Sequence, residues 1–289
     1  MPPAPADPDE AVRLLEDLVG DGEVVVLSGA GLSTESGIPD YRGPTGAARP
    51  ATPMTYQVFT REPAARQRYW ARSHVGWHVV ADAEPNAGHR AVAALQRAGL
   101  LRGVVTQNVD GLHTAAGARD VVELHGALSR VVCLDCGELS DRSELDARLR
   151  AANALWRASA EVVKPDGDVD LPEDVLERFV VVPCLVCAGV LKPDVVFFGE
   201  TVPADRVARS FALVEGAGAL LVLGSSLTVM SGYRFVRRAA ELGVPVALVN
   251  QGPTRGDAQA SVRVDAPLGV VLSDLAVRLG AAAGVRSPS

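Results

Sequence analysis

Short apolar runs alternate with amphipathic segments along most of this chain. The runs have the length of buried strands, and we expect strands at 24–27, 103–106, 121–124, 195–198, 220–224 and 244–249. Apolar residues at helical spacing predict helices over 9–19, 62–75, 86–99, 203–215, 231–242 and 269–280. Alternating strands and helices are typical of a parallel sheet that is covered on both faces. The sequence therefore predicts an α/β, Rossmann-like fold.

The pattern changes between residues 127 and 193. This segment holds all four cysteines, several prolines and the polar stretch 164–170. We interpret it as a small metal-binding module inserted into a larger domain that comprises residues 9–126 and 194–282. The proline-rich residues 1–8 are expected to be disordered, and residues 283–289 to form a flexible C-terminus.

The cysteines form two identical pairs, Cys133-x-x-Cys136 and Cys184-x-x-Cys187. Two such turns together can supply the four thiolates of a tetrahedral zinc site. The separation of the pairs exceeds that of a usual zinc ribbon, but an insertion lengthens a loop without changing the ligands. Redox dithiols and disulfides are the alternatives, and neither explains two matching pairs in a cytoplasmic protein. Four thiolates close the coordination shell, so the predicted zinc is structural.

A glycine-dense loop, residues 29–43 (GAGLSTESGIPDYRG), follows the first predicted strand. Open α/β sheets bind ligands at this edge, and glycines let backbone N–H groups face a phosphate. The spacing departs from the dinucleotide pattern G-x-G-x-x-G, because the glycine after Gly31 is Gly37. The loop also continues into charged and aromatic residues that a simple phosphate loop does not need. We therefore expect a ligand-binding loop that takes part in chemistry.

Composition excludes several classes of function. The chain has 289 residues, of which 48% are hydrophobic, and a formal net charge of −7, so bulk charge does not indicate a nucleic-acid partner. No apolar run reaches the length of a membrane span, and the N-terminus resembles neither a secretion signal nor a presequence. We expect a cytoplasmic, bacterial protein that acts as a monomer, with no nucleic-acid or membrane partner.

Five motifs in this order resemble the sirtuins, the NAD-dependent protein deacylases. They are the glycine loop 29–43, TQNVDGLH at 106–113, ELHG at 123–126, KPDVVFFGE at 192–200 and GSS at 224–226. The resemblance covers about residues 10–280. Four stretches, 66–77, 133–138, 165–168 and 232–235, are most similar to the class II branch, which includes the mitochondrial sirtuin numbered four.

The resemblance implies a catalytic centre and a set of NAD contacts. Spacing alone does not choose among the five histidines, but the family's catalytic base lies in the context of His125, and His113 would be a packing or loop residue. Asn108 would hold the ribose and a water, and Asp110 the nicotinamide carboxamide, although both residues also suit an Asx turn or a helix cap. The implied NAD contacts are Gly29, Ala30, Gly31, Ser33, Thr34, Asp40, Tyr41, Arg42, Gln107, Asn108, Val109, Asp110, Gly224, Ser225, Ser226, Asn250, Gln251, Gly252 and Leu268.

The implied reaction converts an acyl-lysine protein and NAD into nicotinamide, free lysine and 2′-O-acyl-ADP-ribose. The substrate peptide would add as a strand to the edge formed by Val195, Phe198, Gly199 and Glu200, whose alternative role is that of a core strand. A protein mono-ADP-ribosyltransferase would use the same NAD site and is the alternative function. A dehydrogenase needs different glycine spacing, and a zinc-binding module would explain the cysteines alone.

Tyr69 and Arg72 suggest a preference for the acyl group. They lie at i and i+3 of a predicted helix and so share a face. The desuccinylase branch of the sirtuins uses a tyrosine and an arginine at this spacing to bind an acidic acyl chain, and a guanidinium suits a carboxylate. The sequence therefore predicts that acidic acyl-lysines are preferred over acetyl-lysine. The alternative is that Tyr69 packs in the core and Arg72 is a solvated helix residue.

Overall fold

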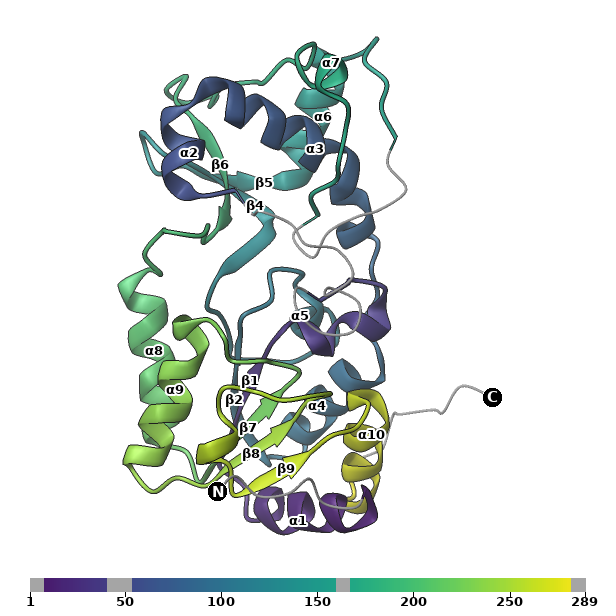
Figure 1. Cartoon of the computed structure of the whole chain (residues 1–289), viewed down its shortest axis with the longest axis vertical. Helices are drawn as coiled ribbons and strands as arrows, with labels where there is room; N and C mark the ends of the chain where they lie inside the picture. The colour runs from purple at the N-terminus through teal and green to yellow at the C-terminus, as the bar shows by residue number, and fades with distance from the viewer. Residues whose placement is uncertain (1–7, 41–53, 160–166, 282–289) are drawn as a thin grey trace.

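The computed structural model describes residues 8–40, 54–159 and 167–281. In this part of the chain the strands form one sheet of six strands and one of three. The two sheets lie toward opposite ends of an elongated molecule (Figure 1). None of the helices within these ranges is both long enough and apolar enough to cross a membrane.

The six-stranded sheet is parallel and has the order β3-β2-β1-β7-β8-β9. Its strands are β1 (Val24–Ser28), β2 (Leu101–Thr106), β3 (Val121–Glu123), β7 (Ala219–Leu223), β8 (Val246–Val249) and β9 (Val262–Val264). Every residue of β1 and β7 is buried, as expected for central strands covered on both faces. The strand order reverses between β1 and β7, and such a switch point is where open α/β sheets bind their ligands.

Helices cover both faces of this sheet (Figure 1). On one face lie α1 (Pro8–Gly20), α4 (Ala87–Arg97) and α10 (Leu268–Arg278), and on the other α8 (Ala204–Glu215) and α9 (Met230–Glu241). Four short helices lie in loops, namely η1 (Ala30–Leu32), η2 (Thr34–Ser36), α5 (Leu112–Ala115) and η3 (Asp257–Gln259). The predicted α/β fold is confirmed.

The three-stranded sheet is antiparallel, with the order β5-β4-β6. Its strands are β4 (Gly126–Cys133), β5 (Leu139–Asp141) and β6 (Leu191–Val195), and the helices beside it are α2 (Tyr56–Arg61), α3 (Pro63–Ala81), α6 (Arg142–Ala152) and α7 (Glu173–Leu176). Buried side chains of α2 and α3, such as Phe59 and Trp70, share one core with Leu149 and Phe179. The predicted boundaries had placed α2 and α3 in the larger domain, whereas their side chains pack with the smaller sheet.

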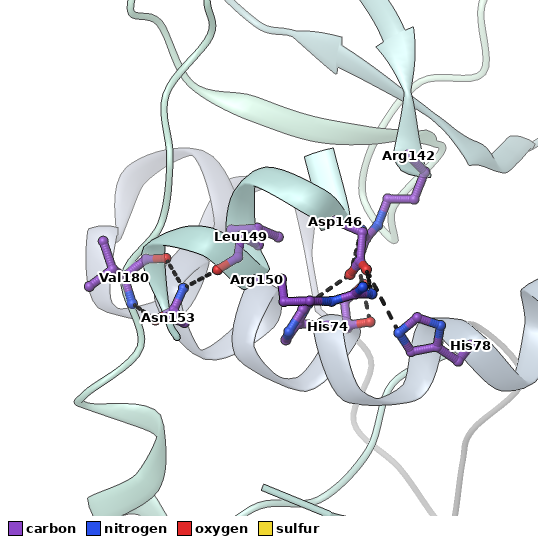
Figure 2. Close-up of polar contacts among 9 residues, drawn as sticks. His74, His78, Arg142, Asp146, Leu149, Arg150, Asn153 and Val180 are labelled. Atoms are coloured by element: carbon purple, nitrogen blue, oxygen red, sulfur yellow. Dashed lines mark hydrogen bonds and ion pairs between the residues drawn. The ribbon is translucent and has the colours of Figure 1, made fainter. Parts of the chain in front are cut away.

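A buried carboxylate joins α3 to α6 (Figure 2). Asp146 of α6 accepts a hydrogen bond from Nδ1 of His74 at 2.7 Å, and its other oxygen lies 3.7 Å from Nε2 of His78. Two guanidinium groups of α6 also contact Asp146, that of Arg150 at 2.8 Å and that of the buried Arg142 at 3.4 Å. These contacts fix the long helix α3 against the smaller domain.

The expected strand at 195–198 is wrong in position. The structure places β6 at Leu191–Val195, where it pairs with β4 of the smaller sheet. The apolar pattern predicts a strand at 195–198 instead, because Lys192, Pro193 and Asp194 are unusual in a buried strand. Pro193 is tolerated because β6 is an edge strand. Lys192 is buried because Glu200 pairs with its ammonium group at 3.1 Å.

Candidate active site

A cavity of about 650 Å³ opens at the switch point of the larger sheet and extends to the smaller one. The segments that follow β1, β2, β7 and β8 line it on one side, and Leu128 and Val195 of the smaller sheet line it on the other. Residues from all five sequence motifs contribute to its walls. The fold therefore brings together residues as far apart in the chain as Gly29 and Leu268.

Two glycine turns meet at the floor of the cavity. A Cβ atom on Gly31 would lie 2.9 Å from the carbonyl oxygen of Gly224, and a Cβ on Gly224 would lie 2.4 Å from the backbone nitrogen of Leu32. Gly224 also has a φ of +60°, which disfavours other residues. The amide of Gly31 donates to the Gly224 carbonyl at 2.9 Å. Glycine at both positions is therefore what lets the loops after β1 and β7 form one surface.

Ser33 links the glycine loop to the two polar residues after β2. Its hydroxyl donates to Asp110 at 2.7 Å and accepts from the amide of Asn108 at 3.0 Å. Asn108 also donates to the carbonyl of Gly29 at 3.1 Å, and Asp110 accepts from the backbone nitrogen of Leu112 at 2.9 Å. Burial raises the pKa of Asp110, although these hydrogen bonds oppose the shift. The network presents an amide and a carboxyl group to the cavity in fixed orientations.

His125 reaches the cavity from the segment between β3 and β4. Its Nδ1 lies 2.9 Å from the carbonyl oxygen of Gln107, which can only accept, so Nδ1 carries the proton. In the neutral ring Nε2 is then an acceptor, and the hydroxyl of Ser231 donates to it at 2.8 Å. Burial lowers the pKa of His125, as do the charges of Arg234 and Arg206, whereas the hydrogen bond to Gln107 acts to raise it. His125 is therefore a neutral imidazole at pH 7, with the tautomer of a general base.

Gln107 holds the surrounding loops together. Its backbone nitrogen donates to the carbonyl of Ser28 at 3.0 Å, and its side-chain amide donates to the hydroxyl of Ser225 at 2.8 Å. These bonds join the ends of β1, β2 and β7 next to His125. Gln107 therefore both orients the imidazole of His125 and holds Ser28 and Ser225, which lie next to the two glycine turns.

A buried polar chain lies beneath Asn108. His113 contacts the hydroxyl of Ser28 at 2.8 Å, Ser28 donates to Thr106 at 2.8 Å, and Thr106 accepts from the backbone nitrogen of Asn108 at 3.1 Å. The prediction of His113 as a packing residue agrees with this burial. Its ring meets that of His89 edge to face, with centroids 5.1 Å apart. Burial lowers the pKa of His113 to about 4 and that of His89 to about 3.

The loop after β6 forms the opposite wall of the cavity. Glu200 accepts from the backbone nitrogen of Phe197 at 2.8 Å and pairs with Lys192. On its outer side, the carbonyl of Phe198 accepts from the backbone nitrogen of Tyr56 at 2.9 Å. One backbone edge of this loop is therefore already paired, and a strand can be added only along another.

The four cysteines form a cluster in the smaller domain, where Cys133 and Cys184 belong to its core. Their sulfur atoms all lie within 4.8 Å of one another, with Cys133 to Cys187 at 3.5 Å and Cys136 to Cys184 at 3.9 Å. Zinc with sulfur ligands at about 2.3 Å requires sulfur–sulfur edges of about 3.8 Å. The geometry fits the zinc ion that the sequence predicts.

Comparison with known proteins identifies this arrangement. The Sir2 family matches residues 29–231, from the glycine loop to Ser231. This chain belongs to the Sir2 family. It is 60% identical over 284 residues to NAD-dependent protein deacetylase 1 of Streptomyces coelicolor, covering 98% of this chain and 94% of that protein. It is also 45% identical to the NAD-dependent protein lipoamidase sirtuin-4, mitochondrial, of Bos taurus, covering 94% and 88% respectively.

Solved structures of the family share the fold. A complex described as Sir2, p53 peptide and NAD⁺ superposes with a TM-score of 0.74 at 28% identity, over 93% of this chain and 98% of that one. A second, described as Sir2 bound to deacetylated p53 peptide and 3′-O-acetyl ADP ribose, has a TM-score of 0.75 at 28% identity over the same shares. The sirtuin resemblance of the five motifs is thus confirmed across nearly the whole chain.

Most of the site residues that the sirtuin motifs predicted line this cavity. These are Gly29, Ala30, Gly31, Ser33, Thr34, Asp40, Tyr69, Gln107, Asn108, Val109, Asp110, His125, Val195, Phe198, Gly199, Glu200, Gly224, Ser225, Ser226, Asn250, Gln251, Gly252 and Leu268. Tyr41 and Arg42 lie outside the described residues. These residues therefore share one cavity, and the role of each one stays a prediction.

Arg72 does not line the cavity with Tyr69. Its guanidinium lies 2.7 Å from the carboxylate of Asp168 and 2.9 Å from that of Asp170, and its Nε contacts the carbonyl of Val169. Tyr69 is buried among aromatic rings and meets Phe59 and Phe197 edge to face. The two residues that the sequence paired for one acyl group therefore have different surroundings.

Several residues that line the cavity were not singled out as site residues, although Ile38, Pro39, Val196 and Phe197 lie within predicted motifs. The apolar ones are Ile38, Pro39, Met54, Leu128, Val196, Phe197, Val202, Leu227, Val229 and Pro253, and the polar ones are Thr228 and Ser231. Ser231 is the one that contacts His125. It directly precedes the stretch 232–235 that resembles class II sirtuins, but a single serine at the start of a helix carried no signal of its own.

Proposed function

We propose that this chain is an NAD-dependent protein-lysine deacylase, which transfers the acyl group of a modified lysine to ADP-ribose. The observation that carries the proposal is the convergence of His125, Asn108 and Asp110 on one cavity at the switch point of the sheet. The deacetylase names of its relatives and the NAD and peptide complexes of its structural neighbours support the same function.

The cavity suits an extended dinucleotide. The loops after β1 and β7 would hold the phosphates, because their glycines leave backbone N–H groups open to a ligand. Asn250, at the end of β8, would hold the adenosine ribose, and Asp110 would bind the nicotinamide amide. When bound, NAD supplies a ribose carbon from which nicotinamide can leave.

His125 is the residue suited to take a proton. Its Nε2 faces the cavity as an acceptor, while the bond from Nδ1 to Gln107 stabilises the imidazolium that forms on protonation. Burial keeps the pKa of the free imidazole low, so the base is in its active form at neutral pH. We assign to it the removal of a ribose hydroxyl proton during acyl transfer.

The opposite wall would receive the substrate. Val195, Phe198, Gly199 and Glu200 are proposed to contact the peptide that carries the acyl-lysine. The apolar residues Ile38, Met54, Leu128 and Phe197, together with Tyr69, line the cavity and would surround the acyl chain. A preference for acidic acyl groups would require Arg72 to exchange Asp168 or Asp170 for the acyl carboxylate.

The cysteine cluster would hold one zinc ion with a closed shell of four thiolates, and its role would be structural. A cytoplasmic location, a monomeric state and the absence of nucleic-acid and membrane partners stay predictions from the sequence.

Mass spectrometry of the protein with NAD and an acetyl-lysine peptide tests the function. We expect deacetylated peptide, nicotinamide and acetyl-ADP-ribose, and we expect His125→Tyr to abolish the last product. Modified protein heavier by one ADP-ribose, with the peptide unchanged, would instead favour the ADP-ribosyltransferase. Full turnover by His125→Tyr would reject His125 as the base.

A further inference from the structure

Both ring nitrogens of His125 are engaged by neighbours on different elements. The carbonyl of Gln107 accepts from Nδ1 at 2.9 Å, and the hydroxyl of Ser231 donates to Nε2 at 2.8 Å. An imidazole held at both nitrogens cannot flip or rotate without losing a hydrogen bond. The proposed reaction uses Nε2 of this ring, so the neighbour of Nε2 bears directly on it.

The fold places Ser231 by close packing. Ser231 is the second residue of α9, and the next residue, Gly232, lies against Gln107. A Cβ on Gly232 would lie 2.5 Å from Oε1 of Gln107, so a larger residue there would displace the Gln107 amide that donates to Ser225. The start of α9 and Gln107 thus hold His125 from two sides. The Nε of Arg234, one turn later, donates to the carbonyl of Ser231 at 3.1 Å and fixes this first turn.

We propose that Ser231 is a positioning residue for His125. Its hydroxyl keeps the ring in the orientation and tautomer in which Nε2 faces the cavity, until the substrate hydroxyl takes its place. The proposal rests on the deacylase function proposed above. It assigns no chemical step to Ser231 itself, which acts only through the histidine.

The hydrogen bond of Ser231 has a measurable electrostatic consequence. A hydroxyl that donates to Nε2 stabilises the neutral ring and so favours a low pKa for His125. The cationic groups that act on the ring, Arg234 of α9 and Arg206 of α8, lower the pKa as well. Arg234 bonds to the backbone carbonyl of Ser231 and Arg206 to Asp194, and replacing the Ser231 side chain removes neither partner. Loss of the hydroxyl should therefore raise the pKa of His125 by itself.

Two reactions of the same enzyme distinguish a positioning role of Ser231 from a general loss of active-site structure in the variant. Exchange of labelled nicotinamide into NAD, with acetyl-peptide present, needs nicotinamide to leave but does not need the later proton transfer to His125. In Ser231→Ala we expect formation of acetyl-ADP-ribose to fall about tenfold, the usual effect of one lost hydrogen bond, while exchange stays within about twofold. The acidic limb of the pH profile of acetyl-ADP-ribose formation should move to higher pH.

Two further variants complete the experiment. Ser231→Thr keeps the hydroxyl and should restore most of the activity and the wild-type pH profile. Ser143→Ala is the matched control, because Ser143 is also the second residue of a helix, α6, but is exposed and outside the cavity lining. We expect it to behave as wild type in both reactions.

Three results for Ser231→Ala would overturn the proposal. They are an equal fall in both reactions, an unchanged pH profile, and faster deacylation, which would mean that Ser231 merely obstructs Nε2. A wild-type enzyme that forms no acetyl-ADP-ribose at all would instead reject the deacylase function, and the positioning role with it.

Discussion

The carboxylate of Asp146 on α6 accepts a hydrogen bond from His74 on α3 at 2.7 Å, at a position where the Asp146 side chain is only 4% exposed. Burial acts to raise the pKa of Asp146, but the hydrogen bond and charge of His74, with Arg142 and His78, lower it to about 2. Segments about seventy residues apart in the chain are joined by this buried charge (Figure 2).

Replacing this carboxylate should destabilise the protein. We expect Asp146→Asn to lower the free energy of unfolding by about 3 kcal/mol, because Asp146 is the one carboxylate among the described residues that pairs with the buried guanidinium of Arg142. Denaturant unfolding measures the change. Asp274→Asn is the control, since Asp274 pairs with Arg278 on an exposed helix face and its loss should cost less than about 1 kcal/mol. Equal stability of the two variants would contradict the structural role of Asp146.

Much of the fold could be predicted because the central strands are apolar except for Ser28 at the end of β1. Val24–Ser28 and Ala219–Leu223 are buried along their whole length, and a run of such residues has few other interpretations. Strand β6 could not be predicted in the same way. It contains Lys192, whose burial depends on Glu200, and a pairing of this kind is visible only once the chain has folded.

The candidate site, like the fold, could be predicted only in part. Motif order was enough to bring His125, Asn108 and Asp110 together, because each follows a strand of the parallel sheet and so reaches the same edge. The partners of Arg72 were not predictable. Asp168 and Asp170 lie about a hundred residues further along the chain, and helical spacing relates a residue only to its own helix.

Acid should destabilise the protein well above the pH at which carboxylates are protonated. His89 and His113 have folded-state pKa values of about 3 and 4, against 6.5 in the unfolded chain. The unfolded state therefore binds more protons below pH 6.5, so the stability from these buried neutral rings is fully present above 6.5. It is lost as the pH falls toward 4, by an amount of the order of several kcal/mol.

Unfolding free energies measured at intervals from pH 7 to pH 4.5 test this expectation. His113→Gln removes one of the two rings, so its stability should fall less steeply with acid than that of the wild type, whatever its stability at pH 7. Arg90 is the other group whose charge acts on His89, and it is present in both proteins. Parallel curves for the two proteins would show that His113 does not contribute.

Removal of zinc should unfold or loosen the smaller domain. We expect elemental analysis to find one zinc per chain, and a strong chelator to lower the melting temperature, because the four sulfur atoms converge on a single point. Cys136→Ser provides a sharper measurement. Cys136 is exposed, so its replacement loses little packing, and a large fall in stability would report the lost metal ligand. An unchanged melting temperature after complete zinc removal would argue against a structural site.

We predict that the acyl preference depends on a competition for Arg72. Two carboxylates occupy its guanidinium, but Asp168 is 19% exposed and Asp170 is 82% exposed, so Asp168 holds it more firmly. We expect Asp168→Asn to increase the ratio of activity on glutaryl-lysine to activity on acetyl-lysine several-fold, because it frees a guanidinium face for the acyl carboxylate. Asp170→Asn, the matched control, should change the ratio much less.

Arg72→Ala should remove any preference of the wild type for the acidic group, as the pairing of Tyr69 and Arg72 in the sequence predicts. If Arg72→Ala, Asp168→Asn and the wild type all give the same ratio of rates on the two peptides, Arg72 has no part in acyl recognition and serves only to bind the segment around Val169.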